Sequence, residues 1–265
     1  IKPTGKGLSF TIVLSIWAVL STLTIALRIW ARYTIRGFGV DDYLMILGYI
    51  VFVFLLVFDF LSINFGVGAH AERLTDYDVM QAKKWFLFAG IAYAIATALV
   101  KVSISFLLIR VTRGTKHIFT WILYGVIVLA CVGSLTSITA YATRCKPFSA
   151  AWNPIGTCRS GAILENVTWF FSVVCIFTDW VCATLPILII WQLKLPLRTK
   201  IQLGFILALG MIASVATIIR MRHLTDYVRP TDFLYSITDV SLWSETEACL
   251  GLIAGSLPTL RPLLR

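Results

Sequence analysis

Seven apolar stretches, each long enough to cross a lipid bilayer, constrain this chain more than any other feature of its sequence. A helix needs about 20 mostly apolar residues to span the hydrocarbon core. The stretches are 9–31, 43–65, 85–109, 118–142, 165–191, 201–222 and 235–258. A soluble helical protein would leave too little polar surface to cover seven such runs. The sequence therefore predicts an all-α fold, a polytopic membrane protein with a seven transmembrane helix bundle.

Composition supports this prediction. Charged residues make up 14% of the 265 residues, against about 25% in soluble domains. The net charge of +10 does not indicate a nucleic-acid partner, because the basic residues gather at the ends of the apolar runs, where they meet lipid headgroups. The lipid bilayer is the partner that this pattern indicates. No internal repeat or low-complexity linker divides the chain, so residues 1–265 are expected to form one seven-helix domain whose tails are trimmed.

The distribution of basic residues leaves the orientation open, since each side of the membrane would carry eleven of them. On one side they are packed into short loops, which include Arg110, Arg113 and Lys200. The opposite side has longer loops, one of which holds Cys145 and Cys158 with twelve residues between them. A disulfide there would require an oxidising compartment, whereas the alternative is a free pair. We predict the disulfide, with the N-terminus outside and the C-terminus cytoplasmic.

Charged residues inside the apolar stretches are the candidate functional residues, because each costs at least about 2.5–3.5 kcal/mol and needs a partner or water. Glu247 shares one stripe of the seventh stretch with Trp243 and the small residues Gly251 and Gly255, so it is expected to face the bundle. Glu245 points about 200° away at ideal helical spacing, so we expect it to reach the headgroups.

Lys101 lies deep in the third stretch and leans toward the bilayer centre, so it is expected to pair with Asp179 or Glu247. Arg220 is expected to pair with Asp59 or Asp239 near the outer surface. One interpretation is that these ion pairs only fix the register of the helices. The other is a ligand pocket or switch formed by Lys101, Asp179, Glu247 and Trp243.

The sequence shows no catalytic or cofactor motif that fits a membrane bundle. The histidines lie in separate loops without metal-ligand spacing, and no Walker loop or GxSxG motif is present, so we expect neither an enzyme nor a metal site. A retinal protein usually carries its Schiff-base lysine on the seventh helix, whereas the deep lysine here is Lys101 on the third. We therefore expect no retinal and no other cofactor.

A series of short motifs follows in order along nearly the whole chain. It consists of Arg28 and Arg32 before Asp41-Asp42-Tyr43-Leu44, Gly66, Gly68 and His70, Lys101-x-Ser103 with Arg110, Cys145-x-Pro147, Trp152 and Cys158, Asp179 with Leu185-Pro186, Lys200 and Gly204, Arg220, Asp232, Trp243-Ser244, Glu247, Leu257-Pro258 and Arg261-Pro262. In these residues the chain resembles the fungal rhodopsin-like integral membrane domain, also called the satratoxin-cluster-protein-four family. The resemblance implies a seven-helix fungal protein of the plasma membrane, and it singles out Lys101, Asp179 and Glu247. Arg110 ends the third stretch without the DRY triplet of animal receptors.

Three functions follow from this combination. The first is a receptor-like sensor, in which an unknown extracellular ligand enters from the outer loops and a cytoplasmic signalling protein reads the basic inner loops around Arg110, Arg113 and Lys200. The alternative is a transporter or accessory membrane component of a secondary-metabolite pathway, with the polar core as a permeation route. The third is a structural membrane protein in which the charges only hold the helices together.

Overall fold

The computed structural model of the protein describes residues 5–70, 74–111, 117–153, 156–191, 197–223 and 233–264, which form seven α-helices. The helices are α1 (Lys6–Ile35), α2 (Val40–Asn64), α3 (Asp76–Val111), α4 (His117–Thr143), α5 (Gly161–Trp191), α6 (Leu197–His223) and α7 (Phe233–Ser256). The shorter elements are the strands β1 (Cys145–Lys146) and β2 (Thr157–Cys158) and the 3₁₀ helices η2 (Phe148–Ala151) and η4 (Leu257–Leu264).

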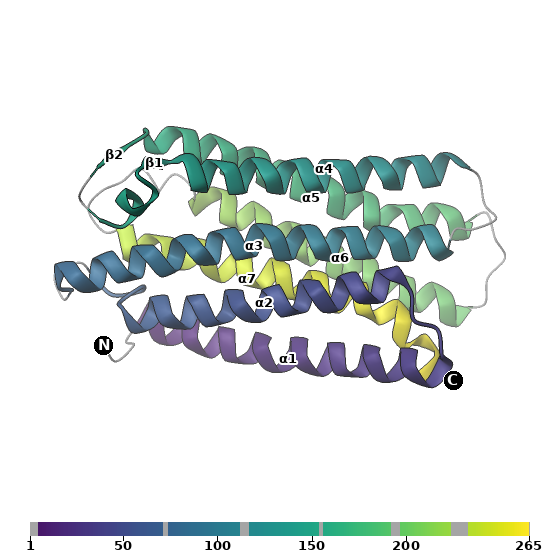
Figure 1. The fold of residues 1–265 in the computed structure, drawn as a ribbon. Coiled ribbons are helices and arrows are strands. Elements are labelled where there is room, and N and C mark those ends of the chain that lie inside the picture. Colours follow the sequence, from purple (N-terminus) through teal and green to yellow (C-terminus); the bar gives the residue numbers. More distant parts are fainter. Residues whose placement is uncertain are drawn as a thin grey trace.

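The helices run side by side along one long axis, and α1 begins at one end of the bundle whereas η4, which follows α7, lies at the opposite end (Figure 1). We call the end that holds β1 and β2 the disulfide end. We call the opposite end, where α1 meets α2 and η4 follows α7, the arginine end. Helix α3 contacts α2, α4, α5 and α7, while α7 contacts α1, α2, α3 and α6. These two helices therefore form the centre of the bundle.

The outer surface of the bundle is apolar. Trp30, Trp121 and Val128 are at least 60% exposed, and α1, α2, α4 and α5 carry many other exposed large hydrophobic side chains. Among the described residues, five helices are long and apolar enough to cross a membrane, namely α1 to α4 and α5 as far as Leu185. Such a surface suits a lipid environment, since there is no water in the bilayer core. The predicted all-α membrane bundle is thus confirmed.

The largest difference from the predicted helix boundaries is the start of α3, which begins at Asp76 rather than at residue 85. Thr75 and Asp78 cap this helix reciprocally. The Thr75 Oγ1 accepts the Asp78 N–H at 3.3 Å, and an Asp78 oxygen accepts the Thr75 N–H at 3.4 Å. This capping box stabilises a polar first segment that the hydropathy of the sequence did not reveal.

A small hairpin covers the disulfide end. β1 pairs with β2 in antiparallel register, and Cys145 and Cys158 form the predicted disulfide. Trp152, which follows η2, packs against Phe88 of α3 and against Phe148, with ring centroids 6.3 and 5.3 Å apart. These aromatic contacts hold the hairpin against α3.

Candidate functional site

Lys101 of α3 is bound to α5 by three polar contacts. Its ammonium lies 2.5 Å from an Asp179 oxygen, and it also donates to the Cys175 carbonyl at 3.0 Å and to the Thr178 hydroxyl at 2.9 Å. An ammonium has three N–H donors, so all of them have an acceptor. Of the two acids that the sequence offered to this lysine, Asp179 is the partner.

A second buried cation, Arg220 of α6, joins four helices. One terminal nitrogen donates to the Tyr93 hydroxyl of α3 and lies 3.5 Å from a Glu247 oxygen of α7. The other terminal nitrogen donates to Ser172 of α5 at 2.8 Å. The Tyr93 hydroxyl in turn donates to the same Glu247 oxygen at 2.8 Å. The arginine, the phenol and the carboxylate therefore form one network at the centre of the bundle.

This network corrects the predicted partners of Arg220, which were Asp59 and Asp239. Asp239 instead pairs with Lys6 at 2.6 Å, in a partly exposed position at the disulfide end. Asp59 faces Glu245. The physical reason is the rotation of α6 about its own axis, which points Arg220 into the interior between α3, α5 and α7. Hydropathy alone does not define that rotation.

Glu245 also differs from its predicted position at the headgroups, because its side chain is 1% exposed. The angle between Glu245 and Glu247 on α7 does separate them, but α7 contacts α1, α2, α3 and α6. A helix with protein on so many sides buries residues on several faces. The small-residue stripe behaves as predicted: a Cβ on Gly251 would lie 3.3 Å from Val100, and one on Gly255 would lie 2.7 Å from Ile104.

A small cavity opens in the half of the core nearer the disulfide end, and its free space admits a few water-sized molecules. Asp59, Tyr93, Tyr141, Arg220 and Glu245 contribute its ionisable side chains, together with hydroxyl groups such as that of Ser241. The cavity therefore joins the arginine network to the pair of acids on α2 and α7. Lys101 and Asp179 do not line it. Trp243 is partly buried one turn before Glu247, and its predicted role at a ligand site stays a prediction.

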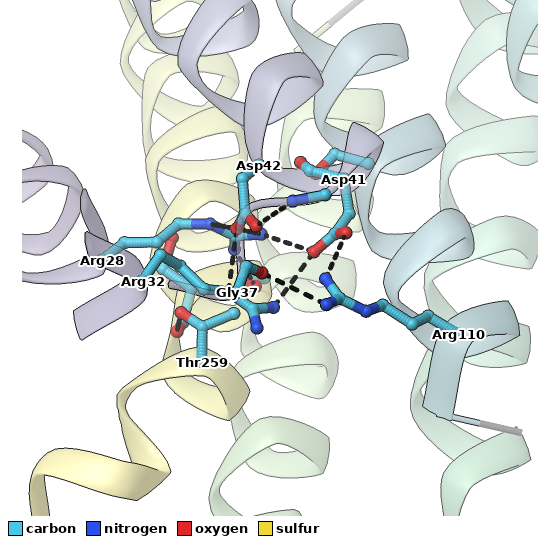
Figure 2. A network of polar contacts seen from close by, with 11 residues as sticks. Arg28, Arg32, Gly37, Asp41, Asp42, Arg110 and Thr259 are labelled. Carbon is cyan, nitrogen blue, oxygen red and sulfur yellow. Dashed lines mark hydrogen bonds and ion pairs between the residues drawn. The ribbon is translucent and has the colours of Figure 1, made fainter. Parts of the chain in front are cut away.

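The arginine end holds a second charged cluster, which Figure 2 shows from close by. Asp41 and Asp42 lie in the first turn of α2, where the helix dipole favours negative charge. Arg28 of α1 lies 2.8 Å from Asp42 and 3.3 Å from Asp41. Arg32, one turn further along α1, lies 3.1 Å from each of the same two carboxylates. The four side chains form a closed network that ties α1 to α2.

Two further contacts extend this cluster to α3 and α7. Arg28 donates to the Gly255 carbonyl of α7 at 2.7 Å. Arg110, at the end of α3, lies 3.3 Å from Asp41 and donates to the Gly37 carbonyl at 3.2 Å. Its side chain is 40% exposed, whereas that of Arg28 is 1% exposed. The cluster thus has a buried centre and one accessible arm.

Of the residues predicted for cytoplasmic coupling, only Arg110 has a described side chain. Arg113 and the side chain of Lys200 lie outside the described residues. Tyr93 and the Asp41-Asp42 pair belong to the two charged networks but were not predicted as functional residues. A signal for the pair existed, because Arg28 and Arg32 are one helical turn apart and the two acids begin the next helix. Nothing in the sequence distinguished Tyr93 from the other tyrosines.

The bundle, the apolar outer surface and the buried ion pairs define a polytopic helical membrane protein with a charged core. Residues 27–265 match the family described as the Fungal rhodopsin domain, and the chain belongs to this family. The resemblance noted in the sequence is therefore confirmed.

Three proteins illustrate what this chain is similar to. Fugralins biosynthesis cluster protein 2 of Gibberella zeae is 25% identical over 275 residues, covering 99% of this chain and 67% of that protein. Receptor GIN3 of Arthrobotrys oligospora is 25% identical over 264 residues, covering 94% and 60%. A SAT4 family membrane protein of Emericella nidulans is 28% identical over 203 residues, covering 76% and 50%.

This chain therefore spans between half and about two thirds of the length of these relatives. No solved structure matches it.

Proposed function

We propose that this protein is a receptor-like sensor of the plasma membrane, not an enzyme, which responds to an extracellular cue and couples to a cytoplasmic signalling protein. The observation that carries the proposal is the cavity beside the Arg220–Tyr93–Glu247 network. Apolar side chains such as Leu55 and Phe171 line it together with polar ones such as Ser244, and sites for small molecules combine these two kinds of side chain. An entering ligand with a polar group would compete directly for the hydrogen bonds of Tyr93.

Helices α3 and α7 supply the route from this cavity to the opposite end. Tyr93 and Arg110 both lie on α3, about 25 Å apart at 1.5 Å per residue. Glu247 and Gly255 both lie on α7, and Arg28 binds the carbonyl of the latter. A ligand shifts such an equilibrium only by its difference in affinity for two arrangements. Here the two arrangements would differ in how α3 and α7 are held at the arginine end.

The disulfide supports the proposed orientation of the bundle in the membrane. A disulfide persists in an oxidising compartment, so we assign the disulfide end to the outside and the arginine end to the cytoplasm. The cavity then lies in the outer half of the bundle, and the exposed arm of Arg110 lies on the cytoplasmic side. The similarity to Receptor GIN3 supports the same function.

The second candidate is a transporter or accessory membrane component of a secondary-metabolite pathway. The similarity to Fugralins biosynthesis cluster protein 2 favours it, and the polar core would then be part of a permeation route. A receptor and a transporter differ in one measurable respect, since only the transporter moves its ligand across the bilayer.

The receptor proposal can be tested on protein reconstituted in nanodiscs, with a fluorophore on a cysteine introduced by Val111→Cys at the exposed end of α3. The exposed Cys131 is first replaced by alanine. Fractions of culture medium serve as the source of the cue. We expect at least one fraction to change the fluorescence, and Tyr93→Phe or Lys101→Ala to reduce the response. Tyr49→Phe is the matched control, because its hydroxyl bonds Thr22 away from the cavity.

The same fractions are then applied to proteoliposomes. Accumulation of a compound inside them would favour the transporter. A fluorescence response that is equal in all variants would contradict sensing through the charged core.

A further inference from the structure

Asp59 of α2 and Glu245 of α7 form a buried pair of acids. Each side chain is 1% exposed, and the two carboxyl groups face each other across the α2–α7 contact. Among the described residues, neither oxygen of Asp59 nor the Oε2 of Glu245 has a hydrogen-bond donor. Buried polar groups without partners are costly, and buried unpaired charges cost more. The arrangement is therefore incomplete as it stands.

The charges around the pair do not complete it. In the described core, Lys101 is matched by Asp179, and Arg220 is matched by Glu247. Arg220 lines the same cavity as the two acids, but its terminal nitrogens donate to a phenol and to two serine hydroxyls. Asp59 and Glu245 are thus left over after the basic groups of the core are paired.

The other titratable groups near the pair carry no positive charge at neutral pH. Tyr93 of α3 and Tyr141 of α4 line the cavity with the two acids. Cys249 lies one turn after Glu245 on α7 and interacts with it. Phenols and thiols are neutral in that range unless perturbed, so none of these side chains balances two carboxylates. Within the described part of the chain, the cavity wall therefore offers these two acids no unpaired positive charge.

The site is also accessible and suitable for a small cation. Both acids line the cavity, together with the Ser241 hydroxyl, and the free space admits a few waters. Carboxylate, hydroxyl and water oxygens are the ligands that hard cations prefer. The space is too small for a large organic cation.

We propose that Asp59 and Glu245 form a binding site for one small monovalent cation, either a proton shared between the two carboxyl groups or a sodium ion. The bound cation would neutralise the two facing carboxyl groups where α2 meets α7 at the cavity wall. Its binding would therefore stabilise the packing of these two helices. The site shares its cavity with Tyr93 but does not use the hydrogen bonds of the Tyr93 hydroxyl. It can therefore be present whether or not the protein is a receptor.

The experiment measures the Tm of purified protein in nanodiscs at constant ionic strength, with NaCl exchanged for choline chloride across a pH series. If Na⁺ binds, Tm rises with the logarithm of its concentration, because a ligand of the folded state stabilises it. If a proton binds, Tm in choline falls as pH rises through the titration of the pair, because the folded state holds a proton that the unfolded acids have released. A cation present at about one hundred times its Kd should raise Tm by roughly 5–10 °C.

Asp59→Asn and Glu245→Gln, which keep the shape of each side chain, should remove either dependence. The matched control is Asp239→Asn, which alters an acid of α7 that already has Lys6 as a partner, and it should keep the dependence. A Tm that depends on neither cation, or a dependence that both variants retain unchanged, would overturn the proposal.

A second measurement on the wild-type chain decides the question if the variants fail to fold. Dicyclohexylcarbodiimide modifies protonated carboxyl groups in apolar surroundings, and mass spectrometry locates the adduct. We expect modification at Asp59 or Glu245 that declines with rising pH, or that Na⁺ but not choline suppresses. Labelling of Asp59 or Glu245 that neither pH nor Na⁺ changes would contradict the cation site.

Discussion

At the scale of single residues, Tyr93 connects the charged groups of the core, because its hydroxyl accepts from Arg220 and donates to Glu247. Tyr93→Phe removes both hydrogen bonds and leaves the ring in place. We expect a loss of about 1–3 kcal/mol in the free energy of unfolding, the usual range for a buried group left without its partner. Thermal or denaturant unfolding in detergent measures it. Tyr49→Phe should cost less, since its bond to Thr22 is exposed, and equal losses would contradict this account.

The pair of Lys101 and Asp179 allows a sharper test of whether a buried charge acts alone or with its partner. Lys101→Met leaves Asp179 without its cation, and we expect a loss of about 3–5 kcal/mol. Adding Asp179→Asn removes the stranded charge and should restore most of the loss. A double-mutant cycle on unfolding free energies gives the coupling. Additive losses would show that the two side chains are not coupled.

These residues show what the sequence alone can and cannot predict about the site. For Lys101 the sequence limited the partner to two acids, because depth along the helix and the lean of the side chain left only Asp179 and Glu247. The partners of Arg220 and the burial of Glu245 could not be predicted from the sequence. They depend on how α6 and α7 are rotated, and α7 is packed against four helices, so neither face of it could be assigned to lipid from its pattern.

At the scale of elements, the loop after α2 depends on Gly68, which has a φ of +92°. Its N–H donates to the Leu234 carbonyl at the start of α7, and a Cβ would come within 2.6 Å of the Gly7 backbone. Gly68→Ala therefore combines an unfavourable backbone conformation with a clash. We expect a loss of more than about 1 kcal/mol in unfolding free energy, seen as a lower Tm.

Gly125→Ala is the matched control for that substitution. Gly125 lies within α4, and a Cβ there meets nothing within 4 Å. Because alanine is the better helix former by up to about 1 kcal/mol, we expect no loss or a small gain. A decrease in Tm as large as that of Gly68→Ala would mean that the space around the glycine is not the cause.

The elements themselves were largely predictable, because length and hydropathy identify a spanning helix without knowledge of its neighbours. The error at the start of α3 has a definite cause. Its first turns are polar and precede the apolar stretch. Hydropathy therefore places the start of the helix too late in the sequence. The capping pattern of Thr75 and Asp78 was the available signal.

At the scale of the whole molecule, the arginine end joins four helices, although the sequence predicted only that basic residues would gather there. Counting charges treats each loop separately, whereas Arg28 and Gly255 are brought together only when the first and last helices pack side by side. Contacts of this kind need the three-dimensional arrangement. The number of helices and their lipid environment could be predicted without that arrangement, because both follow from the apolar stretches alone.

The arginine end also separates two effects that a charge substitution can have. Arg28 is buried between Asp41 and Asp42, so Arg28→Ala leaves these two buried carboxylates with one fewer cation and unbalances the negative charge that Arg28 and Arg32 together neutralise. We expect it to lower the unfolding free energy by about 3–5 kcal/mol. Arg110 is 40% exposed and reaches only the edge of the cluster, so Arg110→Ala should cost at most about 1 kcal/mol.

Amide hydrogen exchange should distinguish the two substitutions, because we expect a local effect from Arg110→Ala and a widespread effect from Arg28→Ala. Arg110 is the described side chain that ties the end of α3 to Asp41 and to the Gly37 carbonyl. Its removal should accelerate amide hydrogen exchange in the last turns of α3 while exchange in the middle of the helix stays unchanged, because local opening does not require global unfolding. Arg28→Ala should instead accelerate exchange in α1, α2 and α7 together. Uniform acceleration in Arg110→Ala would show that the Arg110 side chain is part of the structural centre, and the coupling proposed above would then need a different contact.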